Sequence, residues 1–231
     1  MRVEGALKFN KGTEQKLLDY VLKNAEDSNP QSVIDCINEF CWKQHWMMHV
    51  GDEKGLILEK TVMEKQPMNV LELGTYCGYS TILMLKNMKN MDSKVYTIDP
   101  DTATVNNIAK NIIKKAGLLD RVVFLNDYSY DAIPNLTKKI QSEIKFDLVF
   151  IDHEKVCYYK DLLLLEKHNL LDKNVVLVAD NVIVFKINDY RNYVMDKNKF
   201  NTQIHYTKLE YNDKSLDKTV YEDGVIVSTY L

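Results

Sequence analysis

The chain has 231 residues, of which 45% are hydrophobic, and its 30 basic and 33 acidic residues give a formal net charge of -3. This length suits one α/β domain with enough apolar material for a full core. The charge balance leaves no excess of Lys and Arg to neutralise phosphates, so we expect no nucleic-acid partner.

The cysteines do not form a pattern that is typical of a structural zinc site, because none belongs to a C-x-x-C pair and no histidine cluster stands beside them. We expect free thiols in a reducing cytosol. The N-terminus lacks the apolar run of a signal peptide, and no stretch is long enough to span a bilayer. The sequence therefore predicts a soluble, cytoplasmic protein without a membrane partner.

Three helical patterns come first along the chain. Thr13 is expected to cap the first helix, and Asn29-Pro30 has the form of the cap and first residue of the second. The third helix is expected to end near Gln66, because Pro67 disfavours helical backbone in the residue before it.

From residue 69 onwards, short apolar runs alternate with helical stretches. The expected strands are Val70–Leu73, Val95–Ile98, Val122–Leu125, Phe146–Ile151 and Val175–Ala179. The expected helices between them are Gly78–Met88, Asp101–Ala116, Asp131–Ile140 and Tyr158–His168. This β-α-β-α rhythm predicts a parallel, doubly wound sheet.

The C-terminal tail has a different pattern. Thr202–Tyr211, Lys218–Tyr221 and Val225–Tyr230 are expected to be antiparallel strands, with Asp223-Gly224 as a hairpin turn. We expect residues 1–231 to form one α/β domain. Within it, residues 1–66 supply helices that partly cover the site, and residues 67–231 form the sheet core.

The segment Val70–Ser80 has the pattern of a strand, a glycine turn and a helix start. Gly74 allows the backbone to approach a ligand closely, and the free N–H groups at the helix start suit a carboxylate. The dinucleotide fingerprint G-x-G-x-x-G is absent, because Tyr76 stands where its second glycine would relieve crowding around a pyrophosphate. A ligand without a diphosphate fits better, and S-adenosylmethionine (SAM) is such a ligand.

Asp99 ends the next strand, 25 residues after Gly74. An acidic side chain there can accept hydrogen bonds from both hydroxyls of a ribose. The alternative is an ordinary strand-to-helix turn with a solvated aspartate.

Polar side chains follow two later strands, at Asp152-His153-Glu154-Lys155 and at Asp180-Asn181. In an open α/β sheet, ligands bind at the carboxyl ends of the strands. Asp152, Asp180 and Asn181 offer three hard oxygen ligands, which suit Mg²⁺ and not zinc. The alternative is that Asp152 and Asp180 cap the segments that follow them.

Lys155 lies three residues beyond Asp152. A lysine that faces a divalent cation in a partly desolvated pocket has its ammonium form disfavoured, and it can then act as a general base. The alternative is a surface lysine at a helix start.

These residues resemble catechol O-methyltransferase over nearly the whole chain, from about Thr13 to Tyr230. The most specific matches are Val50–Gly55, Leu71–Ser80, Asp152–Lys155, Leu162–Lys167 and Ala179–Val184, and Asn24–Glu26, Gln31–Val33 and Leu209–Tyr211 also resemble the family. The resemblance implies a Rossmann-like SAM methyltransferase fold with a mostly parallel sheet, antiparallel C-terminal strands and extra N-terminal helices. It also implies methyl transfer from SAM to one hydroxyl of a Mg²⁺-chelated catechol.

The resemblance further implies roles for individual residues. Asp152, Asp180 and Asn181 match the family's Mg²⁺ ligands, Lys155 matches its base, and Glu210 matches the carboxylate that holds the second hydroxyl. The positions expected to bind SAM are Val50, Glu72, Gly74, Tyr76, Ser80, Asp99, Pro100, Ser129, Asp152 and His153. Those expected to contact the acceptor are Trp46, Met48, Lys155, Asn181, Phe185 and Glu210.

Four positions depart from the mammalian members of this family. Glu154, Pro100 and Tyr130 replace a tryptophan, a methionine and a glutamine around the adenine, and Phe185 replaces a proline beside the catechol ring. The metal and base residues are kept, whereas the adenine packing and the acceptor wall change. The stretch Asn212–Tyr221 is also longer than in the family.

Two other functions are weighed against catechol methylation. One is a cation-dependent O-methyltransferase for another vicinal diol or a phenylpropanoid acceptor, and the other is a non-catalytic SAM-fold binding protein. The expected partner is a small, catechol-like molecule, and the expected state is a monomer or a weak homodimer.

Overall fold

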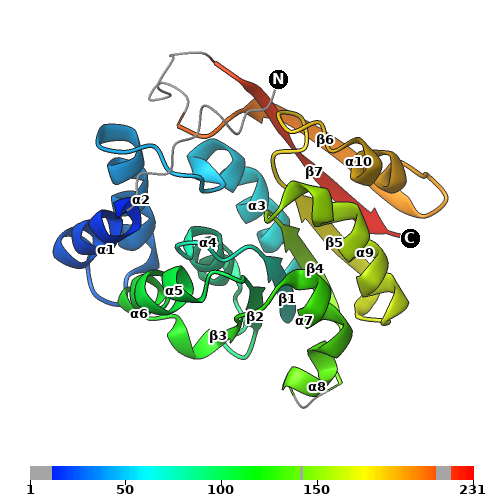
Figure 1. The fold of residues 1–231 in the computed structure, drawn as a ribbon, viewed down its shortest axis with the longest axis horizontal. Helices are drawn as coiled ribbons and strands as arrows, with labels where there is room; N and C mark the ends of the chain where they lie inside the picture. The colour runs from blue at the N-terminus through cyan, green and yellow to red at the C-terminus, as the bar shows by residue number, and fades with distance from the viewer. Residues whose placement is uncertain (1–11, 141–142, 212–219) are drawn as a thin grey trace.

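The computed structural model describes residues 12–140, 143–211 and 220–231. These residues form a seven-stranded sheet in the order β3-β2-β1-β4-β5-β7-β6 (Figure 1). The strands are β1 Asn69–Leu73, β2 Lys94–Ile98, β3 Val122–Leu125, β4 Phe146–Ile151, β5 Leu171–Ala179, β6 Phe200–Lys208 and β7 Glu222–Tyr230. β1 to β5 are parallel, and β7 is antiparallel to both β5 and β6. The predicted α/β fold is confirmed.

Helices cover both faces of the sheet (Figure 1). They are α1 Thr13–Asn24, α2 Pro30–Lys43, α3 Gly51–Lys65, α4 Tyr79–Asn87, α5 Thr102–Thr104, α6 Lys110–Lys115, α7 Ser129–Ala132, α8 Leu136–Ile140, α9 Tyr158–Lys167 and α10 Asn188–Val194. Alternate strand residues point to opposite faces. Leu148 and Phe150 therefore pack in the core with α1 to α4, whereas Val149 and Ile151 pack with α7, α9 and α10.

The strand order reverses between β1 and β4, and this switch point positions the site. From β1 the chain continues to β2 and β3 on one side, whereas β4 and β5 lie on the other. Leu73 pairs with Ile151, and Ile151 pairs with Ala179. The carboxyl ends of β1, β4 and β5 are therefore level, which is where ligands bind in open α/β sheets.

The predicted helix boundaries are largely confirmed at the N-terminus. The Asn29 side chain accepts a hydrogen bond from the Ser32 N–H, and Pro30 is the first residue of α2. α3 stops before Gln66, whose backbone is left-handed with φ 48°. The cap predicted at Thr13 is wrong, because Gly12 with φ 94° occupies the cap position and Thr13 is already helical.

Two predicted helices are interrupted. The helix expected over 101–116 contains a π-helical turn, Val105–Ala109, between α5 and α6. The helix expected over 131–140 is divided between α7 and α8 by a 3₁₀ turn, Ile133–Asn135. The turn contains Pro134, which lacks the N–H group that a continuous α-helix requires.

The hairpin turn predicted at Asp223-Gly224 is wrong. Both residues lie inside β7, where they pair with Thr207 and Tyr206 of β6. A Cβ atom at Gly224 would lie 2.9 Å from the His205 carbonyl oxygen, so this glycine permits a close approach of two strands rather than a turn.

The strand expected at Lys218–Tyr221 is wrong for the two of these residues that the structure describes. Lys218 and Thr219 lie outside the described residues, and Val220 and Tyr221 precede β7 without being part of it. The longer stretch noted over 212–221 also lies mostly outside them.

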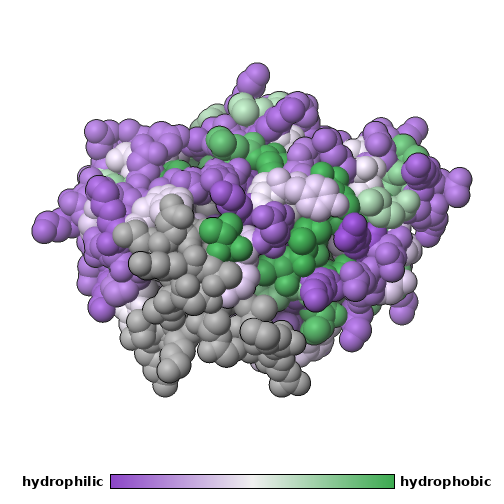
Figure 2. Space-filling view, turned by 90° about the horizontal axis from the view of Figure 1, so that it is seen from above, coloured by the Kyte–Doolittle hydropathy of each residue, from purple (hydrophilic) through white to green (hydrophobic). Residues whose placement is uncertain are grey.

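No helix within the described ranges has the length and apolar character that crossing a membrane requires. Seen from above, the molecule shows a band of hydrophobic residues between hydrophilic margins (Figure 2). Hydrophobic surface is therefore gathered on part of this face and not spread evenly over it.

Candidate active site

Asp152 and Asp180 follow neighbouring parallel strands at the switch point. The Asp152 N–H donates to the Leu73 carbonyl oxygen at 2.9 Å, and the Asp180 N–H donates to the Ile151 carbonyl oxygen at 3.1 Å. Each aspartate thus continues the hydrogen-bonded ladder by one residue. The register of β4 and β5 places the two carboxylates side by side.

Lys155 connects these two strand ends. Its Nζ donates to Asp152 Oδ1 at 2.7 Å and to the Tyr158 hydroxyl at 2.8 Å. That hydroxyl donates to the Asp180 carbonyl oxygen at 3.2 Å. The Lys155 side chain is only 15% exposed, and its Nζ lies 5.5 Å from the centre of the Phe185 ring. Lys155 therefore faces the predicted site and not bulk solvent.

A second lysine, Lys54 of α3, lies among three carboxylates. Its Nζ is 2.9 Å from Asp180, 2.8 Å from Glu210 Oε2 and 2.9 Å from Asp223 Oδ2, and its side chain is 1% exposed. Burial alone would lower the pKa of Lys54, but the three carboxylates outweigh burial and raise that pKa well above its ordinary value. The three carboxylates therefore favour the ammonium form of Lys54 inside the protein.

Asp223 orients the amide of Asn181. Asn181 Nδ2 donates to Asp223 Oδ2 at 2.9 Å, and the Val184 N–H donates to Asp223 Oδ1 at 3.2 Å. Because Asp223 accepts from the donor end of the amide, the amide oxygen remains the group that can act as a metal ligand.

Lys54 and Asp223 were not among the site residues predicted from the sequence. The signal for Lys54 was present, because its spacing places it on the same helical face as Gly51, Leu58 and Val62, all of which are buried. A lysine on the buried face of a helix requires an anionic partner. Asp223 gave no such signal, because Asp-Gly is also a common turn sequence.

The cluster around these residues has an excess of negative charge. Four carboxylates, those of Asp152, Asp180, Glu210 and Asp223, face the ammonium groups of two lysines. Burial raises the pKa of Asp180 well above its ordinary value, with the neighbouring carboxylates adding to the effect and Lys54 opposing it. A group of oxygen donors with surplus negative charge fits a hard divalent cation such as Mg²⁺.

The glycine turn after β1 lies against the same strand end. A Cβ atom at Gly74, where φ is 101°, would lie 2.6 Å from the Asp152 carbonyl oxygen. The N–H groups of Thr75 and Tyr76 donate to Asp99 Oδ2 at 3.0 and 2.9 Å. Asp99 therefore fixes the shape of the turn in this structure.

Glu72 and Ser80 meet beneath this turn. Ser80 Oγ and Thr81 Oγ1 donate to the two carboxylate oxygens of Glu72 at 2.6 and 2.5 Å. Burial raises the pKa of Glu72 to about 7, although both hydroxyls oppose the shift. The Glu72 carboxyl, with its pKa near neutral pH, thereby links β1 to the start of α4.

The other predicted site residues occupy two regions. Trp46 Nε1 donates to the Glu210 carbonyl oxygen at 2.9 Å, so Trp46 borders the acidic cluster. Met48 and Phe185 are half-buried, and Val50 is the buried N-cap of α3. Pro100 is exposed after β2, and Ser129 begins α7 after β3, so both lie on the side of the switch point away from β5.

Comparison with known proteins shows to which family the chain belongs. The O-methyltransferase family model matches residues 24–216. The chain belongs to the O-methyltransferase family. It is 41% identical to catechol O-methyltransferase B of Danio rerio over 211 residues, which are 90% of this chain and 78% of the relative. It is 38% identical to catechol O-methyltransferase of Bos taurus over 213 residues, 90% of this chain and 76% of the relative. The resemblance identified from the sequence is confirmed.

Solved structures support the fold assignment of this O-methyltransferase. An O-methyltransferase from Bacillus cereus in complex with SAH has a TM-score of 0.69, with 20% sequence identity and full coverage of both chains. At that identity, the likeness concerns the arrangement of helices and strands alone.

Proposed function

We propose that this O-methyltransferase transfers a methyl group from SAM to one hydroxyl of a catechol, with Mg²⁺ as its metal and Lys155 as its base. The observation that carries the proposal is the position of Lys155 Nζ, which contacts both Asp152 and Tyr158 beside the acidic cluster. The similarity to catechol O-methyltransferases of vertebrates supports the choice of acceptor.

Asp152, Asp180 and Asn181 would hold the metal. When bound, Mg²⁺ lowers the pKa of the acceptor hydroxyls and orients them. Asp223 would support this set by holding the amide nitrogen of Asn181, which would leave the amide oxygen to bind the cation. Lys54 contacts the Asp180 carboxylate and fixes its position.

Lys155 would accept the proton of the reacting hydroxyl at Nζ. Asp152 and Tyr158 fix the position of this nitrogen, so that little conformational freedom is lost when the acceptor binds. Once Lys155 has taken the proton, the acceptor oxygen would bond to the methyl group that SAM supplies, and S-adenosylhomocysteine would be the leaving group. Phe185, close to the same nitrogen, would pack against the acceptor ring.

Glu210 would accept a hydrogen bond from the second hydroxyl. Its carboxylate is buried and is held by Lys54 at 2.8 Å, while the Trp46 indole donates to its backbone oxygen. These two contacts hold Glu210 at the border of the acidic cluster. A vicinal diol that reaches both Lys155 and Glu210 would be bound through both oxygens.

The groups for SAM would lie along the ends of β1, β2 and β3. Gly74 and Asp99 shape the turn, and Glu72 supports it from below. The remaining proposed contacts are Val50, Tyr76, Ser80, Pro100, Ser129, Asp152 and His153. Because Gly74 has no side chain, the turn packs directly against the backbone of Asp152 at the end of β4.

An acceptor screen tests the proposal. Purified protein is incubated with SAM and a panel of vicinal diols, phenylpropanoid esters and simple phenols, with Mg²⁺ or with EDTA. Methylated catechol that forms only with Mg²⁺ is the expected product. If the panel yields no methylated vicinal diol, the acceptor assignment is overturned, and equal rates in EDTA would overturn the metal.

A further inference from the structure

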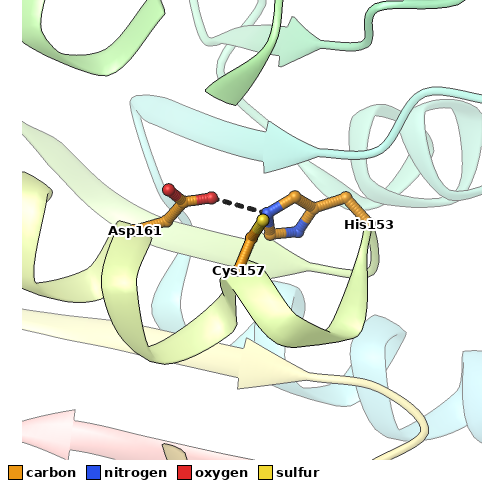
Figure 3. Close-up of side chains that lie close together, drawn as sticks. All are labelled: His153, Cys157 and Asp161. Atoms are coloured by element: carbon orange, nitrogen blue, oxygen red, sulfur yellow. Dashed lines mark hydrogen bonds and ion pairs between the residues drawn. The ribbon is translucent and has the colours of Figure 1, made fainter. Parts of the chain in front are cut away.

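Three side chains of different chemistry gather at the start of α9. His153 precedes the 3₁₀ turn Lys155–Cys157, Cys157 ends that turn, and Asp161 lies in the first turn of α9. Their potential ligand atoms all lie within 4.8 Å of one another. Figure 3 shows the three side chains close together. His153 Nε2 and Asp161 Oδ2 are 2.6 Å apart.

We propose that His153, Cys157 and Asp161 form a second metal site, distinct from the acidic cluster, that binds a borderline divalent cation such as Zn²⁺. Imidazole nitrogen, thiolate sulfur and carboxylate oxygen are the donors that Zn²⁺ uses in proteins. In a tetrahedral zinc site, neighbouring ligand atoms are roughly 3.3–3.8 Å apart, as follows from the metal–ligand bond lengths. Small side-chain movements therefore suffice to place a cation between the three atoms.

The negative charges of the three ligands would neutralise a divalent cation. The Cys157 thiolate and the Asp161 carboxylate together carry two negative charges, so the complex with Zn²⁺ is neutral and suits a partly buried position. Asp161 is 1% exposed, whereas Cys157 is only half-buried and leaves a path for the metal. Three protein ligands leave a fourth position for water.

One proton is released when the metal binds. The Cys157 thiol loses its proton to solvent, and His153 Nε2 exchanges its contact with Asp161 for the metal, with the imidazole proton on Nδ1. Within the part of the chain that the structure describes, Nδ1 has no hydrogen-bond partner. Metal-binding histidines usually have one, so we expect weaker binding here than in structural zinc sites.

The histidine ring is already fixed in position. It stacks on the Tyr158 ring, with centroids 5.3 Å apart and planes 7° from parallel. A ligand whose orientation is set before the metal arrives loses less conformational entropy on binding.

The two proposed metal sites differ in the cations they select. Asp152 belongs to a group of oxygen donors, whereas its neighbour His153 belongs to a group with nitrogen and sulfur. Mg²⁺ prefers oxygen and does not compete well for the second group. Zn²⁺ is therefore expected to bind at His153 even when Mg²⁺ is in excess.

A metal ion at this site is expected to affect the binding of the methyl donor, SAM. His153 is among the residues proposed to contact SAM, so Zn²⁺ bound there weakens SAM binding. This consequence rests on the proposed function, whereas the binding of the metal does not.

Co²⁺ is the probe for the site, because a thiolate ligand gives it a charge-transfer band and tetrahedral geometry gives it intense visible bands. Metal-stripped protein is titrated with Co²⁺ in excess Mg²⁺, followed by displacement with Zn²⁺ and competition against a chromophoric chelator. Cys157→Ser and Asp161→Asn are compared with Cys36→Ser, a cysteine control on α2.

The wild type and Cys36→Ser are expected to show both bands, and Cys157→Ser is expected to lose the charge-transfer band. Zn²⁺ affinity should fall by about tenfold or more in Cys157→Ser and in Asp161→Asn. Absence of the bands in the wild type, or their persistence in Cys157→Ser, overturns the proposal.

Calorimetry with SAM separates this proposal from the proposed function. Zn²⁺ is expected to weaken SAM binding in the wild type and not in Cys157→Ser, whose methylation rate in zinc-free buffer equals that of the wild type. If SAM fails to bind at all while the Co²⁺ bands are present, the metal site stands and the proposed function falls. If SAM binds and Zn²⁺ leaves its affinity unchanged, the inhibitory role is wrong.

Discussion

Lys54 Nζ lies 2.9 Å from the carboxylate of Asp180, although 126 residues separate the two in the sequence. The contact joins α3 of the N-terminal helices to the end of β5. It is fully buried, and Glu210 and Asp223 contact the same ammonium group. The protein thus carries a fixed internal cation that holds the acidic cluster together.

Replacing Lys54 by Met leaves three buried carboxylates without their common partner. We expect the free energy of unfolding to fall by about 3–5 kcal/mol, as is typical when one partner of a buried ion pair is removed. Added Mg²⁺ should restore more stability to Lys54→Met than to the wild type, because more negative charge is left for the cation. Thermal unfolding with and without Mg²⁺ measures both effects.

Lys60→Met on the same helix is the control, because the Lys60 side chain is 72% exposed. If Lys54→Met does not fold, the double variant Lys54→Met/Asp223→Asn, which removes one negative charge as well, should recover part of the stability. Stability of Lys54→Met equal to that of the control would contradict the account.

Asp223 is expected to influence metal affinity through Asn181. Asp223→Ala removes the acceptor that holds the Asn181 amide, and we expect Mg²⁺ affinity to fall by about 10–100-fold. Asp223→Asn keeps an oxygen acceptor of the same size and should lose less. Calorimetric titration of Mg²⁺ into both variants makes the comparison, and equal affinities in Asp223→Ala and the wild type would show that Asn181 needs no such support.

Lys155→Ala should lower kcat by about 10²–10⁴-fold, the usual contribution of a general base. Lys160→Ala, a few residues farther along the chain on α9, removes an exposed lysine and should keep the wild-type rate. Initial rates with saturating SAM and catechol provide the measurement. A Lys155→Ala enzyme within a few-fold of the wild type would exclude Lys155 as the base.

The pKa of Glu72, raised by burial to about 7, makes stability depend on pH. The unfolded chain releases this proton near the ordinary value of 4.5, so between these values the folded state holds more protons. The free energy of unfolding should therefore fall as the pH rises from 4.5 to 7, by up to about 3 kcal/mol from this group. Urea unfolding across this range should show a shallower slope in Glu72→Gln.

Glu64→Gln is the matched control for that experiment, since the Glu64 side chain is 70% exposed. It should retain the slope of the wild type. An unchanged slope in Glu72→Gln would mean that Glu72 is already ionised in the folded protein at low pH.

The parallel part of the fold was predictable because each strand is a short apolar run bounded by turn residues. Asp152 and Asp180 could be placed together for the same reason: carboxyl ends of adjacent parallel strands share one edge of the sheet. α10 was missed because its buried residues, Tyr190 and Val194, are too few to show a helical period.

The rest of the site depends on contacts between distant segments. The residues next to Asp223 in the sequence are compatible with a turn and with a strand. Only the pairing of β7 with β6 makes Asp223 a strand residue, and in that position it contacts Lys54. His153, Cys157 and Asp161 form neither a cysteine pair nor a histidine cluster, so they match no familiar metal-binding motif in the sequence. A mixed set at four-residue spacing becomes visible only once the helix is known.

The central claim, that two strand ends and Asn181 bind one hard cation, is tested most directly by counting bound Mn²⁺ with electron paramagnetic resonance. Mn²⁺ stands in for Mg²⁺ because it also prefers oxygen ligands. A single Mn²⁺ per wild-type chain, displaced by Mg²⁺ and bound much more weakly by Asp152→Asn and Asn181→Ala, is the predicted result. Mn²⁺ bound with equal strength by these variants, or not bound by the wild type, would contradict the account.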